Sequence, residues 1–198
     1  EGFFQFSEEA NMSYQPINKG NMKKTRPGVF YAESKIPQIG RDHIELIKRE
    51  ARNTELGRAR ICAHRDAQSL IHEMFIALSH DTYIRPHKHL GKSESLHVIE
   101  GIADLVFFDD AGKITEVIPL GDYKSNRISY YRINEPAFHA QIVLSEFFVF
   151  HEVTNGPFNR FDTVYAPWAP DENDHCAKKN YVECLSAKLK AVLGGSMS

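Results

Sequence analysis

Short apolar segments separated by turn residues fill the chain from residue 69 to 153, and they restrict the fold more than any other feature. Each segment is rich in β-branched and aromatic residues, and no helical pattern lies between them. The expected strands are 70–78, 94–99, 103–108, 113–120, 127–133, 138–144 and 147–153. Glycines at positions 91, 101, 112 and 121 fall in the intervals. Many short strands at this spacing predict a mainly β fold, either a sandwich or a barrel.

Two helices are expected outside the strand region. In residues 41–55, Ile44, Ile47 and Ala51 form one apolar face, and Asp42 with Glu45 has the spacing of a capping box. A second helical pattern covers residues 177–193. Both helices are expected to pack against the β structure.

These patterns divide the chain into four parts. Residues 1–40 are expected to form an extended arm with an added strand near 29–31, and residues 41–68 a helix and a connector. Residues 69–170 form the barrel, including a loop over 155–170, and residues 171–198 the C-terminal helix and tail. A length of 198 residues suits one domain of this kind.

Charge and cysteine content exclude several classes of function. The 24 Lys and Arg residues nearly balance the 26 Asp and Glu residues, and no basic patch indicates a nucleic-acid partner. No apolar run approaches the roughly 18 residues that a membrane span needs. The three cysteines form neither a CxxC pair nor an even framework, which predicts free thiols in a reducing, cytoplasmic compartment.

A metal site is predicted between residues 87 and 139. His87 and His89 are two positions apart, so in a strand they project to the same side. Gly91 allows the chain to turn, and Glu94 then begins the neighbouring strand. Two imidazoles and a carboxylate hold Fe, Mn, Zn or Ni, and His139 is the best candidate for a fourth ligand. An HxH pair alone arises easily by chance, whereas the full spacing of HxH, Glu and Gly101 is expected in only about a few chains per thousand.

This spacing resembles the first conserved motif of the cupins. The segment ending in Pro136, Ala137, Phe138 and His139 resembles part of the second motif. The wider context is similar to the WbuC-type cupin metalloproteins, through the segments 83–89, 106–112, 156–158 and 166–170. The resemblance implies a double-stranded β-helix, that is, a jelly-roll barrel, with one bound divalent transition metal. It also implies a link to bacterial surface-polysaccharide (O-antigen) metabolism and a homodimer.

Further residues are candidates for binding or catalysis. Arg85 and Tyr83 share the strand parity of His87. Arg85 is expected either to bind an anionic group of a substrate or to form a structural salt bridge. Tyr83 is expected either to donate a hydrogen bond to the ligand or to fill the barrel interior. One of His151 and Glu152 must face the barrel interior. Glu152 is the candidate general base or hydrogen-bond partner of a ligand histidine, with a surface salt bridge as the alternative.

Alternation also places Arg58, Arg60, Cys62 and His64 on one face of a segment. This face is expected to pack against the outside of the barrel, with a second anion site as the alternative.

Three functions remain open on the sequence. The first is a metal-dependent isomerase, epimerase or lyase acting on a small polar or anionic metabolite, such as a sugar or nucleotide-sugar derivative. The second is an Fe(II)-dependent dioxygenase. The third is a non-catalytic barrel that binds a sugar or another metabolite, because one fold supports many functions.

Overall fold

The computed structural model describes residues 22–194, so residues 1–21 of the predicted N-terminal arm lie outside the described residues. Along the chain the elements are β1 (Met22–Arg26), β2 (Val29–Ala32), α1 (Arg41–Asn53), β3 (Arg58–Cys62), β4 (Ile71–Ser79), β5 (His87–His89), β6 (Glu94–Glu100), β7 (Ile102–Phe108), β8 (Ile114–Gly121), β9 (Tyr130–Ile133), β10 (Phe138–Val143), β11 (Phe147–Asn155), a 3-10 turn (Arg160–Asp162), β12 (Thr163–Tyr165) and α2 (His175–Gly194). The predicted mainly β fold with one helix on each side of the barrel is confirmed.

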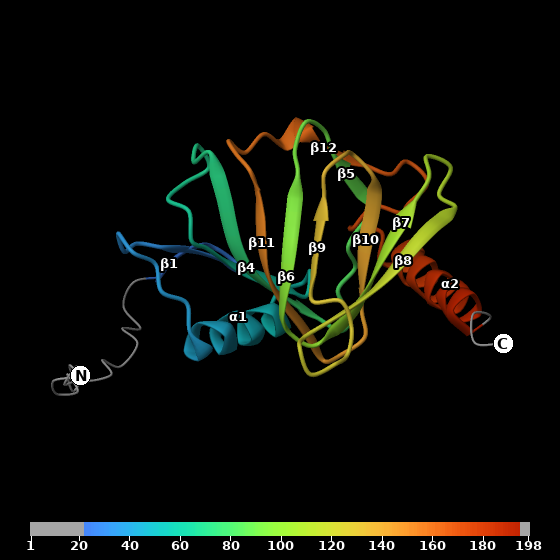
Figure 1. The fold of residues 1–198 in the computed structure, drawn as a ribbon, viewed down its shortest axis with the longest axis horizontal. Coiled ribbons are helices and arrows are strands. Elements are labelled where there is room, and N and C mark those ends of the chain that lie inside the picture. Colours follow the sequence, from blue (N-terminus) through green and yellow to red (C-terminus); the bar gives the residue numbers. More distant parts are fainter. Residues whose placement is uncertain (1–21, 195–198) are drawn as a thin grey trace, which may run out of the picture.

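The strands form two sheets with the connectivity of a jelly roll. One sheet has the order β1-β2-β3-β4-β11-β6-β9, and the other has the order β12-β5-β10-β7-β8. From β4 to β11 the chain changes sheet at every connection except the β7–β8 hairpin. This order gives β4-β11-β6-β9 facing β5-β10-β7-β8, which is the eight-stranded double Greek key. The two sheets are seen side by side in Figure 1.

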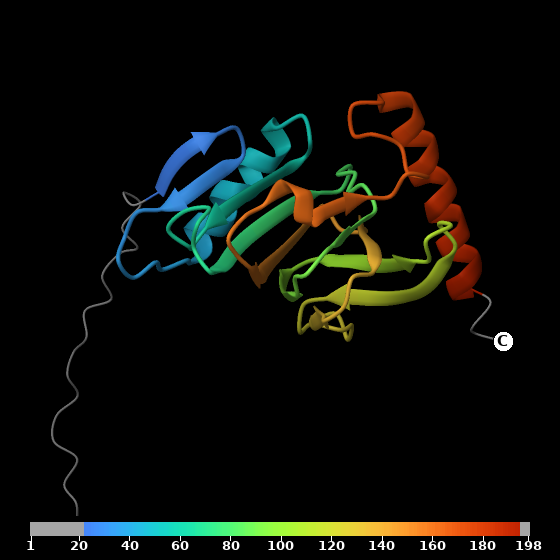
Figure 2. The same ribbon diagram turned by 90° about the horizontal axis from the view of Figure 1, so that it is seen from above.

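Each helix covers the outer face of one sheet, at opposite ends of the molecule (Figure 2). Ile47 and Ala51 of α1 are fully buried in a cluster with Ala59, Ile61 and Ala77, which lie on the outer face of the seven-stranded sheet. On the five-stranded sheet, Leu185 and Leu189 of α2 pack into a cluster with Val106, Phe108, Phe138 and Ala140. Neither helix in the described part of the chain is long and apolar enough to span a membrane.

The space between the sheets is apolar at one end and polar at the other. Leu78, Val98, Leu105, Phe148 and Phe150 belong to the main core, which is closed to solvent. Glu94, at the start of β6, lies two residues beyond the buried Leu96, at the polar end of the same face. Burial of the large apolar cluster stabilises the barrel, and the polar end is left available for chemistry.

Local details differ from the sequence-based expectations at three places. The helix α1 begins after Gly40, whose backbone N–H donates to Nδ1 of His43 at 3.2 Å, so the predicted capping box of Asp42 and Glu45 is wrong. The predicted loop over 155–170 contains β12, which pairs with β5. The third difference concerns the face of β3.

In that strand, Arg60 pairs with Ile76 and Cys62 with Met74, and Ile76 packs against the interior core. Arg60 and Cys62 therefore project from the face of the sheet that is turned toward the barrel interior, whereas Ala59 and Ile61 face α1. The expectation that the face carrying Arg58, Arg60, Cys62 and His64 packs outside the barrel is wrong for this reason.

Candidate metal centre

Three strands from both sheets carry the four predicted metal ligands. His87 and His89 lie two residues apart on β5, and β10 pairs with β5 so that His139 is directly opposite His87. Glu94 begins β6 in the facing sheet. The jelly-roll crossover from β5 to β6, which includes Gly91, therefore brings a carboxylate across the interior to imidazoles on the other side.

The four side chains converge on one point. One ring nitrogen from each of His87, His89 and His139 lies within 4.8 Å of the other two. Glu94 reaches the same group, with Oε2 3.2 Å from His89 Nε2 and Oε1 3.7 Å from His139 Nε2. The predicted juxtaposition of these residues is present in the structure.

The second nitrogen of each imidazole is already engaged. Nδ1 of His87 donates to the backbone oxygen of Arg85 at 2.9 Å, and Nδ1 of His139 donates to that of Ala137 at 2.9 Å. Nδ1 of His89 forms a hydrogen bond with the Thr163 hydroxyl at 3.1 Å. A proton on Nδ1 leaves the lone pair of Nε2 directed at the common point, as in the hydrogen-bonded histidine ligands of metalloproteins.

Electrostatics also prepares the cluster for a cation. Burial, and then the neighbouring His139 imidazole, lower the pKa of His87 to about 3, so this imidazole is neutral at physiological pH. Burial alone would raise the pKa of Glu94, but the hydrogen bond with His89 and the nearby His139 and His87 rings lower it to about 2. A neutral imidazole, as in His87, and an ionised carboxylate, as in Glu94, are the protonation states that bind metal ions.

The residues present fit a divalent transition metal. His139 is 2% exposed, and its Nε2 is buried without a hydrogen-bond partner. An unsatisfied buried nitrogen costs about 1–3 kcal/mol, so its retention calls for a ligand-binding explanation. An ion at the convergence point would satisfy His139, and three nitrogens with one carboxylate oxygen suit Fe, Mn, Zn or Ni.

A second set of side chains holds Glu94 in place. The Tyr131 hydroxyl donates to Glu94 Oε1 at 3.3 Å, and Gln141 Nε2 donates to the Tyr131 hydroxyl at 3.2 Å. Tyr131 and Gln141 are buried on facing sheets, so this chain of hydrogen bonds crosses the interior. Burial, followed by the charge of Glu94, keeps the pKa of Tyr131 well above its ordinary value, and the phenol remains a donor. The sequence offered no spacing that would have identified Tyr131 or Gln141.

The register of β11 shows which residue of the pair 151–152 faces the site. Glu152 lies opposite Leu96 and Met74, whereas His151 lies opposite His97 and stacks on Phe75 with ring centroids 4.6 Å apart. Since Leu96 is part of the interior core, Glu152 faces inward and His151 outward. Burial, and next the Glu94 carboxylate, raise the pKa of Glu152 to about 8.

Arg85 and Tyr83 are not brought together with the four ligands. Arg85 forms an ion pair with Asp171 at 2.9 Å, and its guanidinium stacks over the Tyr165 ring. The hydroxyl of Tyr83 donates to the backbone oxygen of Pro170 at 3.0 Å. Both contacts connect the segment before β5 to the loop before α2. Arg85 thus has the structural salt bridge that was one of its two expected roles, and the Tyr83 hydroxyl is engaged by Pro170.

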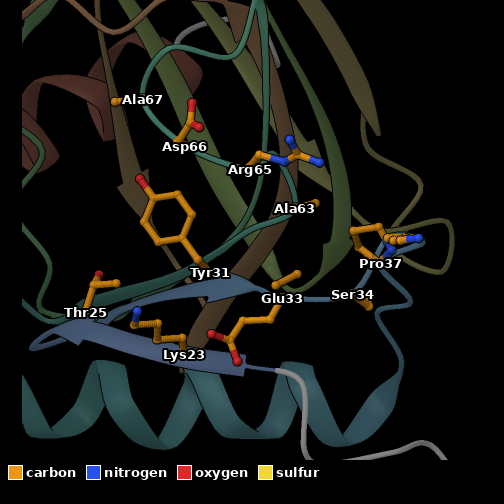
Figure 3. Close-up of a pocket in the computed structure, with 12 residues that line it drawn as sticks. Lys23, Thr25, Tyr31, Glu33, Ser34, Pro37, Ala63, Arg65, Asp66 and Ala67 are labelled. Carbon is orange, nitrogen blue, oxygen red and sulfur yellow. The ribbon is translucent and has the colours of Figure 1, made fainter.

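A pocket of about 660 Å³ opens on the sheet at some distance from the four ligands, and none of them lines it. It lies over β1 and β2, with Lys23, Thr25 and Tyr31 on its floor and Arg65 and Asp66 on its wall. Figure 3 shows Tyr31 projecting from the sheet on the side away from α1. This is the side of the sheet that faces the barrel interior farther along.

A family model described as a domain of unknown function, DUF6016, matches residues 39–120. The match runs from α1 to β8 and covers fewer than half of the 198 residues. None of the curated proteins is significantly similar to the chain.

Several solved structures are distantly similar. A protein from Shewanella oneidensis is 13% identical with a TM-score of 0.42, over 52% of this chain and 66% of the other. Oxalate decarboxylase from Bacillus subtilis is 18% identical with a TM-score of 0.40, over 50% and 24%. The Lactobacillus farciminis oxalate decarboxylase is 16% identical with a TM-score of 0.39, over 49% and 27%.

The chain spans about a quarter of the length of either decarboxylase. Similarity at this level says nothing about function, and the strand order carries the fold assignment. The chain has a jelly-roll fold, with three imidazoles and one carboxylate gathered at the polar end of its interior.

Proposed function

We propose that the protein binds one divalent transition metal through His87, His89, His139 and Glu94, and that it is a metal-dependent enzyme acting on a small, polar, anionic molecule. The observation that carries this proposal is the convergence of three imidazoles, each anchored through Nδ1, on a carboxylate from the facing sheet. Such anchoring orients ligands before the metal binds and raises affinity.

When bound, the metal supplies a Lewis acid that polarises a carbonyl or binds a hydroxyl group of the substrate. The protein's own residues account for the rest. Tyr131 and Gln141 fix the orientation of Glu94. Glu152 faces the same interior, and its raised pKa leaves it protonated near neutral pH, so it can donate a proton and afterwards accept one.

Isomerisation, epimerisation and elimination all need this combination of a polarised oxygen and a proton-transfer group. The resemblance to WbuC-type cupins supports a sugar or nucleotide-sugar derivative of surface-polysaccharide metabolism as the substrate. A dioxygenase reaction is the second candidate, because Fe(II) accepts the same mixed nitrogen and oxygen donors.

The test is metal analysis of protein purified without chelators. We expect one equivalent of a transition metal in the unmodified protein and its loss in His87→Ala and His139→Ala. The matched control is His97→Ala, since His97 lies on β6 but points outward toward Tyr123. A full metal complement in both ligand variants would show that the site is elsewhere.

The identity of the metal and the reaction then separate the candidates. Turnover without oxygen supports the Lewis-acid reaction, whereas iron together with substrate-dependent oxygen uptake supports the dioxygenase. Ligand binding without turnover of any tested compound would contradict both, and would assign the barrel a binding role.

A further inference from the structure

Among residues 22–194, Arg60 is a part-buried arginine without a carboxylate in ion-pair distance. Arg58 on the same strand pairs with Glu172 through both terminal nitrogens, at 3.0 and 3.1 Å. Arg85 and Arg127 each have an aspartate within 3.1 Å. For Arg60, no carboxylate of residues 22–194 lies within ion-pair distance, and its Nε is buried without an acceptor.

The side chain of Arg60 projects from the face of the sheet that is turned toward the barrel interior. Its partner in the register is Ile76, which packs in the interior core, and the next inward residue on β3 is Cys62, opposite Met74. Met74 is in turn opposite Glu152. Arg60 therefore shares a face of one continuous sheet with Glu152 and Glu94.

The groups around the guanidinium do not supply a negative charge at neutral pH. Burial raises the pKa of the Cys62 thiol and of the Tyr31 phenol, and it lowers the pKa of His64, so all three are neutral. Glu152 lies on the same face of the sheet, but no ion pair joins it to Arg60 among the described residues. An uncompensated guanidinium in such surroundings is costly unless an anion from outside the chain pairs with it.

We propose that Arg60 binds the anionic end, a carboxylate or a phosphate, of the molecule whose other end reaches the metal centre. This inference rests on the proposed function, because it takes the metal centre as the place of reaction. It reassigns to Arg60 the anion-binding role that the sequence suggested for Arg85, whose charge Asp171 neutralises. A planar guanidinium binds either anion through two parallel hydrogen bonds.

The spacing of the strands sets a minimum length for the ligand that would join Arg60 to the metal centre. β3 and β6 are separated by β4 and β11, so three inter-strand steps of about 4.8 Å place their backbones about 14 Å apart. Even when the side chains of Arg60 and Glu94 both extend into the interior, much of this separation remains. The anionic group of the ligand must therefore lie several bonds away from the ligand oxygens that bind the metal. A sugar phosphate or a sugar acid meets this condition, whereas a two-carbon dicarboxylate is too short.

The pocket of Figure 3 lies beside the strands that carry Arg60 and its neighbours. Tyr31 lines that pocket and lies opposite Cys62 in the register of β2 and β3, so the pocket adjoins the surroundings of Arg60. Lys23, Lys35 and Arg65 also line it, and they outnumber its two acidic residues, Glu33 and Asp66. A positive balance at the entrance attracts anions.

The experiment is titration calorimetry of inorganic phosphate, and separately of malonate, into the metal-loaded protein. Arg60→Gln is expected to weaken binding of the preferred anion at least about tenfold, because a charge-assisted pair is lost. Arg58→Gln is the matched control, and it should change the affinity less than about twofold. The anion whose affinity falls in Arg60→Gln shows whether the ligand carries a phosphate or a carboxylate at the end that binds Arg60.

Two further readouts keep the test decisive. Metal content should be unchanged in Arg60→Gln, so loss of the metal site and loss of the anion site are scored separately. If Arg60→Gln melts at a much lower temperature, Arg60→Lys takes its place, and it should retain the charge but weaken binding severalfold. Equal affinities in all variants for both anions, or no binding to the unmodified protein, would overturn the proposal whether or not the metal site is correct.

Discussion

The side chains of the candidate site differ in how far the sequence alone could identify them. His87, His89 and Glu94 follow from spacing, because strand alternation and one turn suffice to bring them together. His139 is 50 residues beyond His89 in the chain and required a resemblance to a known motif. Tyr131, Gln141 and Arg60 were missed or misplaced, since their orientation depends on strand pairings that no local pattern encodes.

Tyr131 offers a test of how the carboxylate is held. Tyr131→Phe removes the hydroxyl that donates to Glu94 and leaves Gln141 without its acceptor. We expect the metal dissociation constant to rise about tenfold, measured by competition with a chromogenic chelator. The control is Tyr130→Phe, because Tyr130 is the adjacent residue and is 53% exposed. Equal affinity in the two variants would mean that the hydrogen bond does not support the site.

Glu152 makes the stability of the metal-free protein depend on pH. Its pKa is about 8 in the folded state against 4.5 for the ordinary group, so folding favours the protonated form. The free energy of unfolding should therefore fall as pH rises from about 4.5 to about 8, and no penalty should remain below that window.

Glu152→Gln removes this dependence. In urea denaturation at pH 8 the variant should be more stable than the unmodified protein by on the order of 2–4 kcal/mol, with the difference vanishing near pH 4. Glu73→Gln, which changes an exposed carboxyl on β4, should leave the pH profile as it was. A constant difference at every pH would show that the carboxyl is not responsible.

At the level of elements, strand positions were predictable to within about three residues, and short pairings were not. The alternation of apolar residues with glycine turns identified β4, β6, β7, β8, β9, β10 and β11. By contrast, β12 has three residues and pairs only with β5, so its own sequence carries too little pattern. The inward face of β3 was misassigned because both faces of that strand are buried. One face packs against α1, and on the other Cys62 packs with Val29 and Met74.

The turn between β6 and β7 tests the packing of these elements. Gly101 has φ of +85°, and a Cβ there would lie 2.0 Å from the backbone oxygen of Phe147. Gly91, in the turn before β6, has φ of +65° and no heavy atom within 4 Å of the corresponding position. Gly91→Ala should therefore lower the free energy of unfolding by only about 1–2 kcal/mol, the strain of an alanine in the left-handed conformation.

Gly101→Ala should cost at least about 2 kcal/mol more in the free energy of unfolding, because the clash with β11 backbone is added. Urea denaturation of both variants measures the difference directly. Similar losses in the two variants would mean that the β6–β7 turn can move away from β11 without penalty.

For the whole molecule, the jelly roll creates a site that neither sheet contains alone. The five-stranded sheet supplies the imidazoles, and the seven-stranded sheet supplies Glu94, Glu152 and Arg60. The fold class followed from the sequence because seven of the strands are short segments rich in β-branched and aromatic residues, separated by turn residues. The added strands β1–β3, which extend the inner face beyond the barrel, could not be foreseen in this arrangement, since the parallel pairing of β2 with β3 joins segments on either side of α1.

The most direct test is a crystal structure of the metal-loaded protein with anomalous diffraction measured at the absorption edge of the bound metal. We expect one anomalous peak per chain, about 2.0–2.2 Å from Nε2 of His87, His89 and His139 and from one carboxylate oxygen of Glu94. A peak at other residues, or ligation through Nδ1 of these histidines, would contradict it.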